Sequence, residues 1–357
     1  MKHFCVLPWF GREISYSTVE THCCLLPKNY DINKIRETIK NGGRPSECQK
    51  CWNLEDQGIK SDRQVKNETL DYYLDRDIEM IKKDAVEQGE KILMLKLLTS
   101  FTCNATCVIC CPGASSSWNI LSQKINPSIP IKQYQFVDLD QVKQKVDFKN
   151  LATLSLIGGE PLYEKKNLDL LEYVLEQGND RVFLSIVTNG SVRLNSRWKH
   201  VLSKFQNINL SVSIDGTEKV FEYTRYPLLW KDLEINLEFF KNITENISSN
   251  YTVSNLNVSD HRTSVEWFQS QKINFSINPI YVPAHFSPSA LPISVKESIS
   301  KTFASLAPKH QISLTYSSQD EINYEQFKKE IKQQDHAKGI HMRDYLPELY
   351  QSLDLDY

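Results

Sequence analysis

The sequence has no long hydrophobic segment and no clear excess of charge of either sign. Lys and Arg number 42 against 44 Asp and Glu, which gives a net charge of about −2. Nothing in this balance favours a nucleic-acid-binding protein. No apolar run approaches the roughly 20 residues that span a bilayer, and Pro8 interrupts the short apolar patch at the N-terminus, which makes a poor signal peptide. We therefore expect a cytoplasmic protein that binds neither nucleic acid nor membranes.

Cysteine is absent from the chain after Cys111, and histidine is scarce, with 8 residues in all. The 9 cysteines form two groups, the first with Cys5, Cys23, Cys24, Cys48 and Cys51, the second with Cys103, Cys107, Cys110 and Cys111. A reducing cytosol disfavours structural disulfides, so clustered cysteines there are more often metal or redox sites. The scarcity of histidine near both groups argues against a mixed Cys/His zinc site.

Short apolar runs with the length of strands recur along the chain. They are residues 92–98, 152–157, 182–188, 208–214, 251–258 and 273–281. Segments with helical spacing of apolar residues accompany them, at 68–87, 116–124, 168–177, 196–205, 230–242, 262–271 and 324–334. This alternation predicts an α/β fold with a parallel sheet covered by helices, either an open doubly wound sheet or a partial barrel. In such folds the chemistry lies on loops after the carboxyl ends of strands, where the second cysteine group is found.

Three cysteines of the second group, Cys103, Cys107 and Cys110, have the spacing C-x3-C-x2-C on one short loop. Three thiolates can hold three irons of a [4Fe–4S] cluster and leave the fourth iron free for another ligand. A structural zinc ion would need a fourth nitrogen or sulfur ligand. Cys111 is a poor fourth ligand, because neighbouring residues in a loop tend to point apart. We interpret Cys111 as a small buried hydrophobic residue.

This loop and the sequence IGGEPLY after the second predicted strand together resemble the radical SAM superfamily. The other residues that carry the resemblance are Ile109, Gly158, Gly159, Glu160 and Pro161. The resemblance covers about residues 91–282 and implies a partial (β/α)6 barrel, with a [4Fe–4S] cluster on the three loop cysteines. In that family the open iron binds S-adenosylmethionine (SAM), whose one-electron cleavage yields a 5′-deoxyadenosyl radical that abstracts hydrogen from the substrate. The three loop cysteines are thus the predicted catalytic ligands.

The resemblance also implies a set of SAM-binding residues after successive strands. They are Gly158, Gly159, Glu160, Pro161, Thr188, Asn189, Ser213, Asp215, Arg225 and Ile109. The two glycines would let the backbone approach the amino group of SAM, and Glu160 would accept hydrogen bonds from it. Arg225 resembles the family's arginine that pairs with the SAM carboxylate. Ile109 would face the adenine through its backbone, where many members carry an aromatic residue.

The first cysteine group offers a second set of ligands. The predicted ligands are Cys5, Cys23, Cys48 and Cys51, with Cys24 as the alternative to Cys23. Four thiolates can enclose either an iron–sulfur cluster or a structural zinc ion. The context RPSECQKCWNLEDQ resembles a twitch or SPASM-like module, which favours an auxiliary [4Fe–4S] cluster, although in the family this module usually follows the core. The predicted domains are this module, a linker helix, the radical SAM core and a helical C-terminal extension, at 1–65, 66–90, 91–282 and 283–357.

Family members with such modules often modify ribosomally synthesised precursor peptides. The resemblance therefore implies a peptide-modifying radical SAM oxidoreductase or lyase, which forms a crosslink, an epimer or a splicease-type excision. The implied partners are a precursor peptide, a separate leader-peptide-binding (RRE-type) protein and a flavodoxin- or ferredoxin-type reductant. One alternative is a radical SAM enzyme that acts on a small molecule. The other is a non-catalytic iron–sulfur or zinc protein that serves binding or electron transfer.

Overall fold

The computed structural model describes residues 1–16, 20–133, 136–312, 314, 319–355 and 357. Its strands are β1 Gly11–Ser15, β2 Glu20–Thr21, β3 Met94–Leu98, β4 Thr153–Ile157, β5 Phe183–Thr188, β6 Asn207–Val212, β7 Ile247–Val253 and β8 Asn274–Pro279. They form one sheet in the order β2-β1-β3-β4-β5-β6-β7-β8. The β1–β2 pair is antiparallel, whereas β1–β3, β3–β4, β4–β5, β6–β7 and β7–β8 are parallel. The prediction of an α/β fold with a parallel sheet is confirmed.

Helices lie between the successive parallel strands from β3 to β8, as the apolar periodicity predicts. The α-helices are α1 Leu7–Phe10, α2 Ile32–Lys40, α3 Gln49–Asp56, α4 Asp62–Leu74, α5 Ile78–Glu87, α6 Ser116–Ile125, α7 Leu139–Lys145, α8 Lys165–Glu176, α9 Ser196–Leu202, α10 Glu218–Thr224, α11 Trp230–Lys241, α12 His261–Ser270, α13 Ile293–Thr302, α14 Asp320–Lys338, α15 Met342–Tyr345 and α16 Pro347–Ser352. The helix predicted at 324–334 is the central part of α14. The described residues contain no helix that is long and apolar enough to cross a membrane.

Two predicted elements differ in the structure. The single helix predicted at 68–87 is two helices, because Asp75 adopts a left-handed conformation that ends α4 and the Asp77 side chain then caps α5. The strand predicted at 251–258 ends at Val253, where the side chain of Asn257 accepts a hydrogen bond from the Ser254 amide and turns the chain. Side chains in β7 alternate in burial from its first residue, so the strand begins earlier than predicted.

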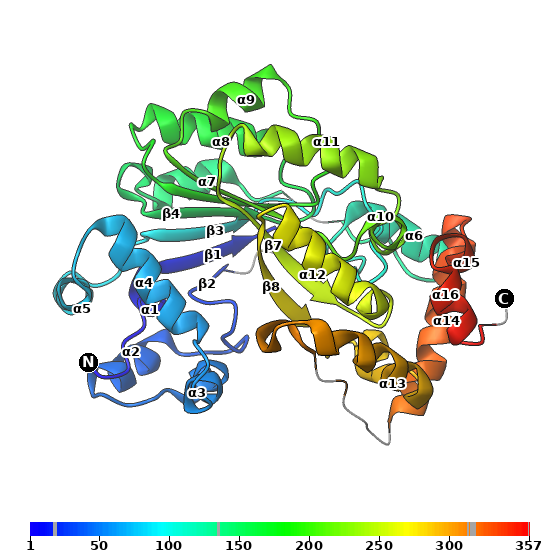
Figure 1. Cartoon of the computed structure of the whole chain (residues 1–357). Coiled ribbons are helices and arrows are strands. Elements are labelled where there is room, and N and C mark those ends of the chain that lie inside the picture. Colours follow the sequence, from blue (N-terminus) through cyan, green and yellow to red (C-terminus); the bar gives the residue numbers. More distant parts are fainter. Residues whose placement is uncertain (17–19, 134–135, 313, 315–318, 356) are drawn as a thin grey trace. The chain divides into compact units, whose positions relative to one another are not determined.

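Strand β1 was not predicted from the sequence. Its residues GREIS include two charged side chains and form no apolar run. It nevertheless pairs in parallel with β3, in register from Gly11 with Met94 to Ser15 with Leu98. The segment before β3 thus contributes β1 and the short β2 to the sheet, and Figure 1 shows β1, β3 and β4 side by side.

The chain divides into two compact units. Unit 1 comprises Met1–Ser100, Tyr134–Ile186 and Leu194–Asn209, and unit 2 comprises Phe101–Gln133, Val187–Arg193 and Leu210–Tyr357. In unit 1 the N-terminal helices bury an apolar core in which the rings of Phe4 and Trp9 stack, with centroids 5.4 Å apart. Backbone amides of Lys91 and Leu93 donate to the carbonyls of Trp9 and Phe10, at 3.1 and 3.0 Å, and so fix α1 against the segment that enters β3.

In unit 2 a mixed aromatic and polar core joins the later helices. The rings of Tyr251 on β7 and Phe268 on α12 pack together in the interior. A fully buried ammonium group, that of Lys296 on α13, pairs with Asp320 at the start of α14, with an N–O distance of 2.6 Å. In Figure 1 the helices α14, α15 and α16 lie together near the C-terminus. The C-terminal extension is therefore a packed part of unit 2.

Candidate metal centre

The cysteine loop begins just after β3 and leads into helix α6, whose first turn holds it. Ser115 caps α6 by accepting a hydrogen bond from the Trp118 amide at 3.2 Å. The Trp118 indole then donates to the carbonyl of Cys107 at 2.6 Å, and the Ser117 hydroxyl donates to the carbonyl of Cys103 at 2.7 Å. The start of the helix therefore fixes the backbone at two of the three predicted cluster ligands.

Backbone groups elsewhere in unit 2 hold the other side of the loop. The amides of Thr106 and Val108 donate to the carbonyls of Tyr226 and Thr224, at 2.7 and 2.8 Å, in the segment at the end of α10. The carbonyl of Val108 accepts a hydrogen bond from the side-chain amide of Gln334 on α14, at 3.0 Å. The loop is thus fixed by α6, by the end of α10 and by α14, and such rigid support is what a cluster site needs.

The thiols of the loop are close enough to influence one another. Burial, with smaller contributions from the nearby thiols of Cys107, Cys111 and Cys103, raises the pKa of Cys110 to about 12. Burial also raises the pKa of Cys107. Cys111 is exposed, which corrects our interpretation of it as a buried hydrophobic residue. Ile109 is half-buried on the same loop.

The donor set of the loop fits an iron–sulfur cluster with one open iron. Among the described residues, no group of three His, Cys, Asp or Glu side chains already has metal-binding geometry. The fit therefore rests on the three thiols, their shared loop and their mutual electrostatic influence. Thiolates are the usual ligands of iron–sulfur clusters, and three of them leave one iron without a protein ligand.

Arg225 lies beside the cysteine loop in a buried ion pair. Its Nη2 is 2.6 Å from Oδ2 of Asp215, and its Nη1 is 4.0 Å from the sulfur of Cys107. Burial opposes its charge, but Asp215 and the Cys107 thiol together raise the pKa of Arg225. Its Nε is buried and has no hydrogen-bond partner in the described part of the chain. A fixed guanidinium with an unused donor is a suitable site for an anionic group such as a carboxylate.

Asp215 was predicted to bind SAM, but the structure gives its carboxylate two partners within the protein. Besides the Arg225 contact of Oδ2, its Oδ1 accepts a hydrogen bond from the Thr252 amide at 3.0 Å. The carboxyl group is 3 % exposed, and burial raises its pKa while Arg225 opposes the increase. In this arrangement Asp215 holds Arg225 in position.

Asn189 and Thr188 lie in unit 2 with the cysteine loop. The Asn189 amide nitrogen is 2.9 Å from Oδ1 of Asn104, which lies inside the C-x3-C segment, and 4.0 Å from the sulfur of Cys103. The Ser213 amide donates to the Thr188 carbonyl at 2.8 Å, so the ends of β5 and β6 are joined. The structure thus brings together the cysteine loop and the predicted residues after these two strands.

The GGEP segment lies in unit 1, directly after β4. A Cβ atom on Gly158 would lie 2.5 Å from the carbonyl oxygen of Ser100, and its φ of +137° is one that L side chains rarely adopt. The Gly159 amide donates to the same carbonyl at 3.1 Å. Glu160 is buried and accepts a hydrogen bond from the Leu162 amide at 3.0 Å. Position 158 therefore requires glycine, because its backbone packs against Ser100, two residues after the end of β3.

The remaining residue of this motif, Pro161, is buried, and its carbonyl accepts a hydrogen bond from Asn167 on α8 at 2.9 Å. This contact fixes the end of the GGEP segment to the helix that follows it. The local reasons for the motif are therefore visible within unit 1 alone.

The N-terminal cysteines also approach one another within unit 1. Burial raises the pKa of Cys5 to about 12, and Cys48 and Cys51 are among the groups that act on it. Burial also raises the pKa of Cys48 to about 11, with a contribution from Cys51. The Cys23 and Cys24 thiols form a hydrogen bond, which raises the pKa of Cys23 and lowers that of Cys24 to about 6. Cys5 acts on Cys23 as well, whereas Cys24 is exposed.

Several residues that shape these sites were not predicted. They are Asn104, Trp118, Gln334 and Lys338 near the cysteine loop, and Arg63 near the N-terminal cysteines. Asn104 lies within the loop motif and could have been considered from its position. The α14 residues carry no sequence signal, because their contacts with the loop are distant along the chain.

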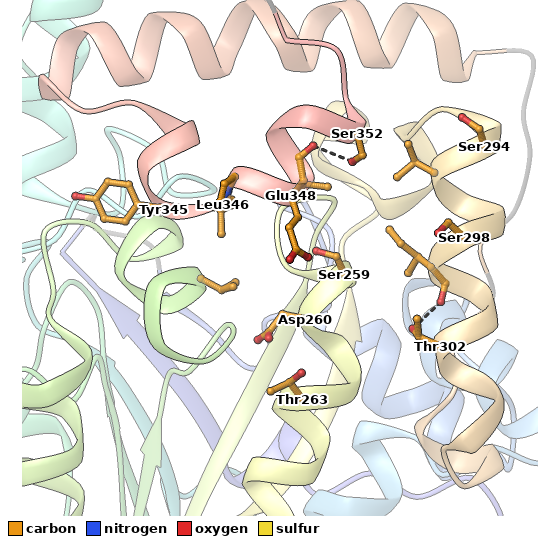
Figure 2. Close-up of a pocket in the computed structure, with 15 residues that line it drawn as sticks. Ser259, Asp260, Thr263, Ser294, Ser298, Thr302, Tyr345, Leu346, Glu348 and Ser352 are labelled. Atoms are coloured by element: carbon orange, nitrogen blue, oxygen red, sulfur yellow. Dashed lines mark hydrogen bonds between the residues drawn. The ribbon is translucent and has the colours of Figure 1, made fainter.

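A separate hollow of about 710 Å³ lies in unit 2, and both polar groups (hydroxyls and carboxylates) and apolar side chains such as Val295, Ile299 and Leu349 line it. Figure 2 shows Ser294, Ser298 and Thr302 of α13 on one side and Glu348 of α16 on another. The Asp260 carboxylate, which also lines it, already accepts hydrogen bonds from the Thr217 amide and the Ser264 hydroxyl. Among the described lining residues there is none of the predicted site residues.

Comparison with known sequences finds similarity to a protein whose name assigns it to the radical SAM enzymes. No family model matches the chain. The chain is similar to a protein of Paramaledivibacter caminithermalis named radical SAM cyclopropyl synthase TigE, with 24 % identity over 209 residues. The aligned region covers 57 % of this chain and 43 % of TigE, so the chain matches less than half of its relative's length.

Solved structures show a weaker likeness. One is native anSMEcpe with bound AdoMet, with 18 % identity, coverage of 55 % of this chain and 56 % of that chain, and a TM-score of 0.42. Another is Streptococcus suis SuiB, with 15 % identity, coverage of 80 % and 60 %, and a TM-score of 0.41. The support for the radical SAM superfamily therefore comes from the sequence similarity to TigE.

Proposed function

We propose that this protein is a radical SAM enzyme. The observation that carries the proposal is the C-x3-C-x2-C loop after β3, held by α6, the end of α10 and α14, with the Arg225 guanidinium 4.0 Å from the Cys107 sulfur. A bound cluster and SAM would together supply a 5′-deoxyadenosyl radical. The similarity to TigE supports the same class of chemistry.

In this proposal each part of the chain has a defined task. The three loop cysteines hold the cluster, and Arg225, kept in place by Asp215, binds the SAM carboxylate with its unused donor. The GGEP backbone, which tolerates no side chain at Gly158, receives the amino group. Thr188, Asn189 and Ser213 contribute the remaining polar contacts, and Pro161 and Ile109 are the last two proposed SAM-binding residues.

The test uses anaerobically reconstituted protein with dithionite as the reductant. We expect cleavage of SAM to 5′-deoxyadenosine and roughly eight irons per chain if both cysteine groups carry [4Fe–4S] clusters. Replacing Cys103, Cys107 and Cys110 by Ala should abolish cleavage and remove about half of the iron. The matched control is Cys111→Ala, which changes an exposed neighbouring thiol and should keep both. Cleavage that survives the triple replacement would show that the site is wrong.

The N-terminal cysteines are proposed to hold an auxiliary cluster. Their support is the mutual electrostatic influence of the Cys5, Cys48 and Cys51 thiols and the smaller influence of Cys5 on Cys23. Arg63 acts on the same group, and its guanidinium lies over the Trp52 ring at 5.1 Å from the centroid. The iron that remains in the triple variant measures this site directly, and zinc in its place would support the alternative of a structural metal.

For the substrate, we propose a ribosomally synthesised precursor peptide. The supporting observation is strand β8, which ends the strand order of the sheet and has alternating exposed side chains. An extended peptide can add to such an edge through main-chain hydrogen bonds. The proposed reaction on this peptide is crosslinking, epimerisation or splicease-type excision. A leader-binding partner and a flavodoxin- or ferredoxin-type reductant belong to it.

A small-molecule substrate is the second candidate, and the hollow in unit 2 offers such a molecule a binding place outside the proposed cluster and SAM residues. Helices α13 and α16 of the C-terminal extension line this hollow with hydroxyl groups, which suit a small polar molecule. Mass spectrometry of a co-expressed precursor peptide separates the two candidates. A mass change that depends on the three loop cysteines supports the peptide, and an unchanged peptide in the presence of SAM cleavage supports the small molecule.

A further inference from the structure

Helix α14 places a cation beside the cysteine loop. The Gln334 side chain donates to the carbonyl of Val108, at 3.0 Å, and accepts a hydrogen bond from the ammonium group of Lys338, at 2.9 Å. Val108 lies between two of the proposed cluster ligands. The amide oxygen is the acceptor that an ammonium group requires, and the amide nitrogen is the donor that a carbonyl requires, so one orientation of Gln334 serves both contacts.

The helix is fixed at this point by a buried polar network. The carboxylate of Asp335, next to Gln334, accepts hydrogen bonds from the hydroxyl groups of Tyr223 and Tyr357, at 2.8 and 2.9 Å, and from the Met342 amide at 2.6 Å. Asp335 is 2 % exposed and Tyr223 is 0 % exposed. This network joins α14 to α10 and to the last residue of the chain, so Lys338, one turn beyond Gln334, has a defined position.

The charge of Lys338 acts on the thiols of the loop. Burial lowers the pKa of Lys338 to about 8, while Cys107, Asp335, Glu330 and Cys110 raise it in return. Lys338 in turn lowers the pKa of Cys107, as does Arg225. Two cations from different parts of unit 2 therefore act electrostatically on one proposed cluster ligand.

We propose that Lys338 is a positioning residue of the metal centre, held by Gln334 so that its ammonium group stabilises the reduced form of the cluster. This inference rests on the proposed function. Reduction adds one electron, from a low-potential reductant such as dithionite, to a cluster that three thiolates already make negative. A nearby cation favours the more negative state, and net charge around the sulfurs is one of the factors that set cluster potentials.

The test is a redox titration of the reconstituted full chain. The reduced cluster is monitored through the electron paramagnetic resonance signal that changes when SAM is added. Because SAM would bind the cluster with the open iron, this signal reports on that cluster and not on an auxiliary cluster. Lys338→Met should change the equilibrium between oxidised and reduced cluster by on the order of tenfold, the size expected when one nearby charge is removed in a medium with an effective dielectric constant of about 20. That factor is equivalent to a fall of about 60 mV in the midpoint potential.

The control variants separate charge from packing. Lys338→Arg keeps the charge and should restore most of the potential. Lys332→Met removes an exposed lysine from the same helix and should leave the potential unchanged. Gln334→Met removes the contact that holds Lys338 and should shift the potential in the same direction, so it also tests the inference if Lys338→Met does not fold.

Two outcomes would overturn the inference. One is a Lys338→Met midpoint equal to that of the wild type; the other, if that variant does not fold, is an unshifted midpoint in Gln334→Met. The result also differs from a failure of the proposed function, in which the wild-type protein would not cleave SAM. Cleavage by the wild type together with an unchanged variant midpoint contradicts only the role of Lys338.

Discussion

The buried pair of Asp215 and Arg225 gives the sharpest stability prediction. Their side chains are 3 % and 13 % exposed, and the N–O distance is 2.6 Å. In Asp215→Asn, the amide oxygen can still accept the hydrogen bond from Thr252, but the amide nitrogen would face the guanidinium. The variant therefore leaves a buried cation without a counter-charge, which costs about 3–5 kcal/mol.

This cost is a large part of a typical unfolding free energy of about 5–15 kcal/mol. With a urea m value near 3 kcal/mol/M, it corresponds to a fall of about 1–1.7 M in the unfolding midpoint. Arg225→Met should have a similar cost, because it leaves the Asp215 carboxylate buried without a counter-charge, with hydrogen bonds from Thr252. The double variant removes both charges and should be less destabilised than the sum of the single variants by about 2–3 kcal/mol.

The assay is urea unfolding of the reduced, metal-free protein, monitored by circular dichroism. The matched control is the exposed pair of Arg262 and Glu266 on α12, in the same unit, whose side chains are 50 % and 55 % exposed. Its coupling should be about 0.3–0.5 kcal/mol. Additive effects of the Asp215 and Arg225 substitutions would refute the reasoning, because they would mean that each charge is stabilised independently of the other.

Two further predictions concern single residues. Gly158→Ala should destabilise the protein by about 1–3 kcal/mol more than Gly178→Ala. The new Cβ would lie 2.5 Å from the Ser100 carbonyl oxygen at position 158, whereas at position 178 it would meet nothing within 4 Å. Equal urea midpoints of the two variants would contradict this. Burial lowers the pKa of His261 below its ordinary 6.5, so its contribution to stability is present above pH 6.5 and is lost as the pH falls below that value. The urea midpoint should therefore fall less between pH 7.5 and 5.5 in His261→Phe than in the wild type, and parallel pH profiles would show that another group is responsible.

The local parts of the fold and site could be predicted from the sequence. Apolar runs located the six parallel strands from β3 to β8, and the cysteine spacing identified the loop after the first of them. Both depend on residues near one another in the chain. Strand β1 could not be found in this way, because GREIS forms no apolar run and is a strand through its pairing with β3.

The partners of the site residues required the structure. Arg225 and Asp215 were both predicted to face SAM, but nothing in their spacing indicates that they bind each other. Gln334 is 226 residues from Val108 in the sequence, so its contact with the cysteine loop depends on how unit 2 folds. Helical periodicity predicted α14 as an element without indicating what its buried face contacts.

The charges in unit 2 favour the packing of helix α14, part of the C-terminal extension, against the cysteine loop. Three thiolates on one short loop repel one another, and burial adds to that cost, as the raised pKa values of Cys107 and Cys110 show. Arg225 offsets part of this cost but is itself paired with Asp215. Lys338 adds a second positive charge through a helix that Asp335 ties to α10, so the extension contributes electrostatically to the metal centre as well as to the core of the unit.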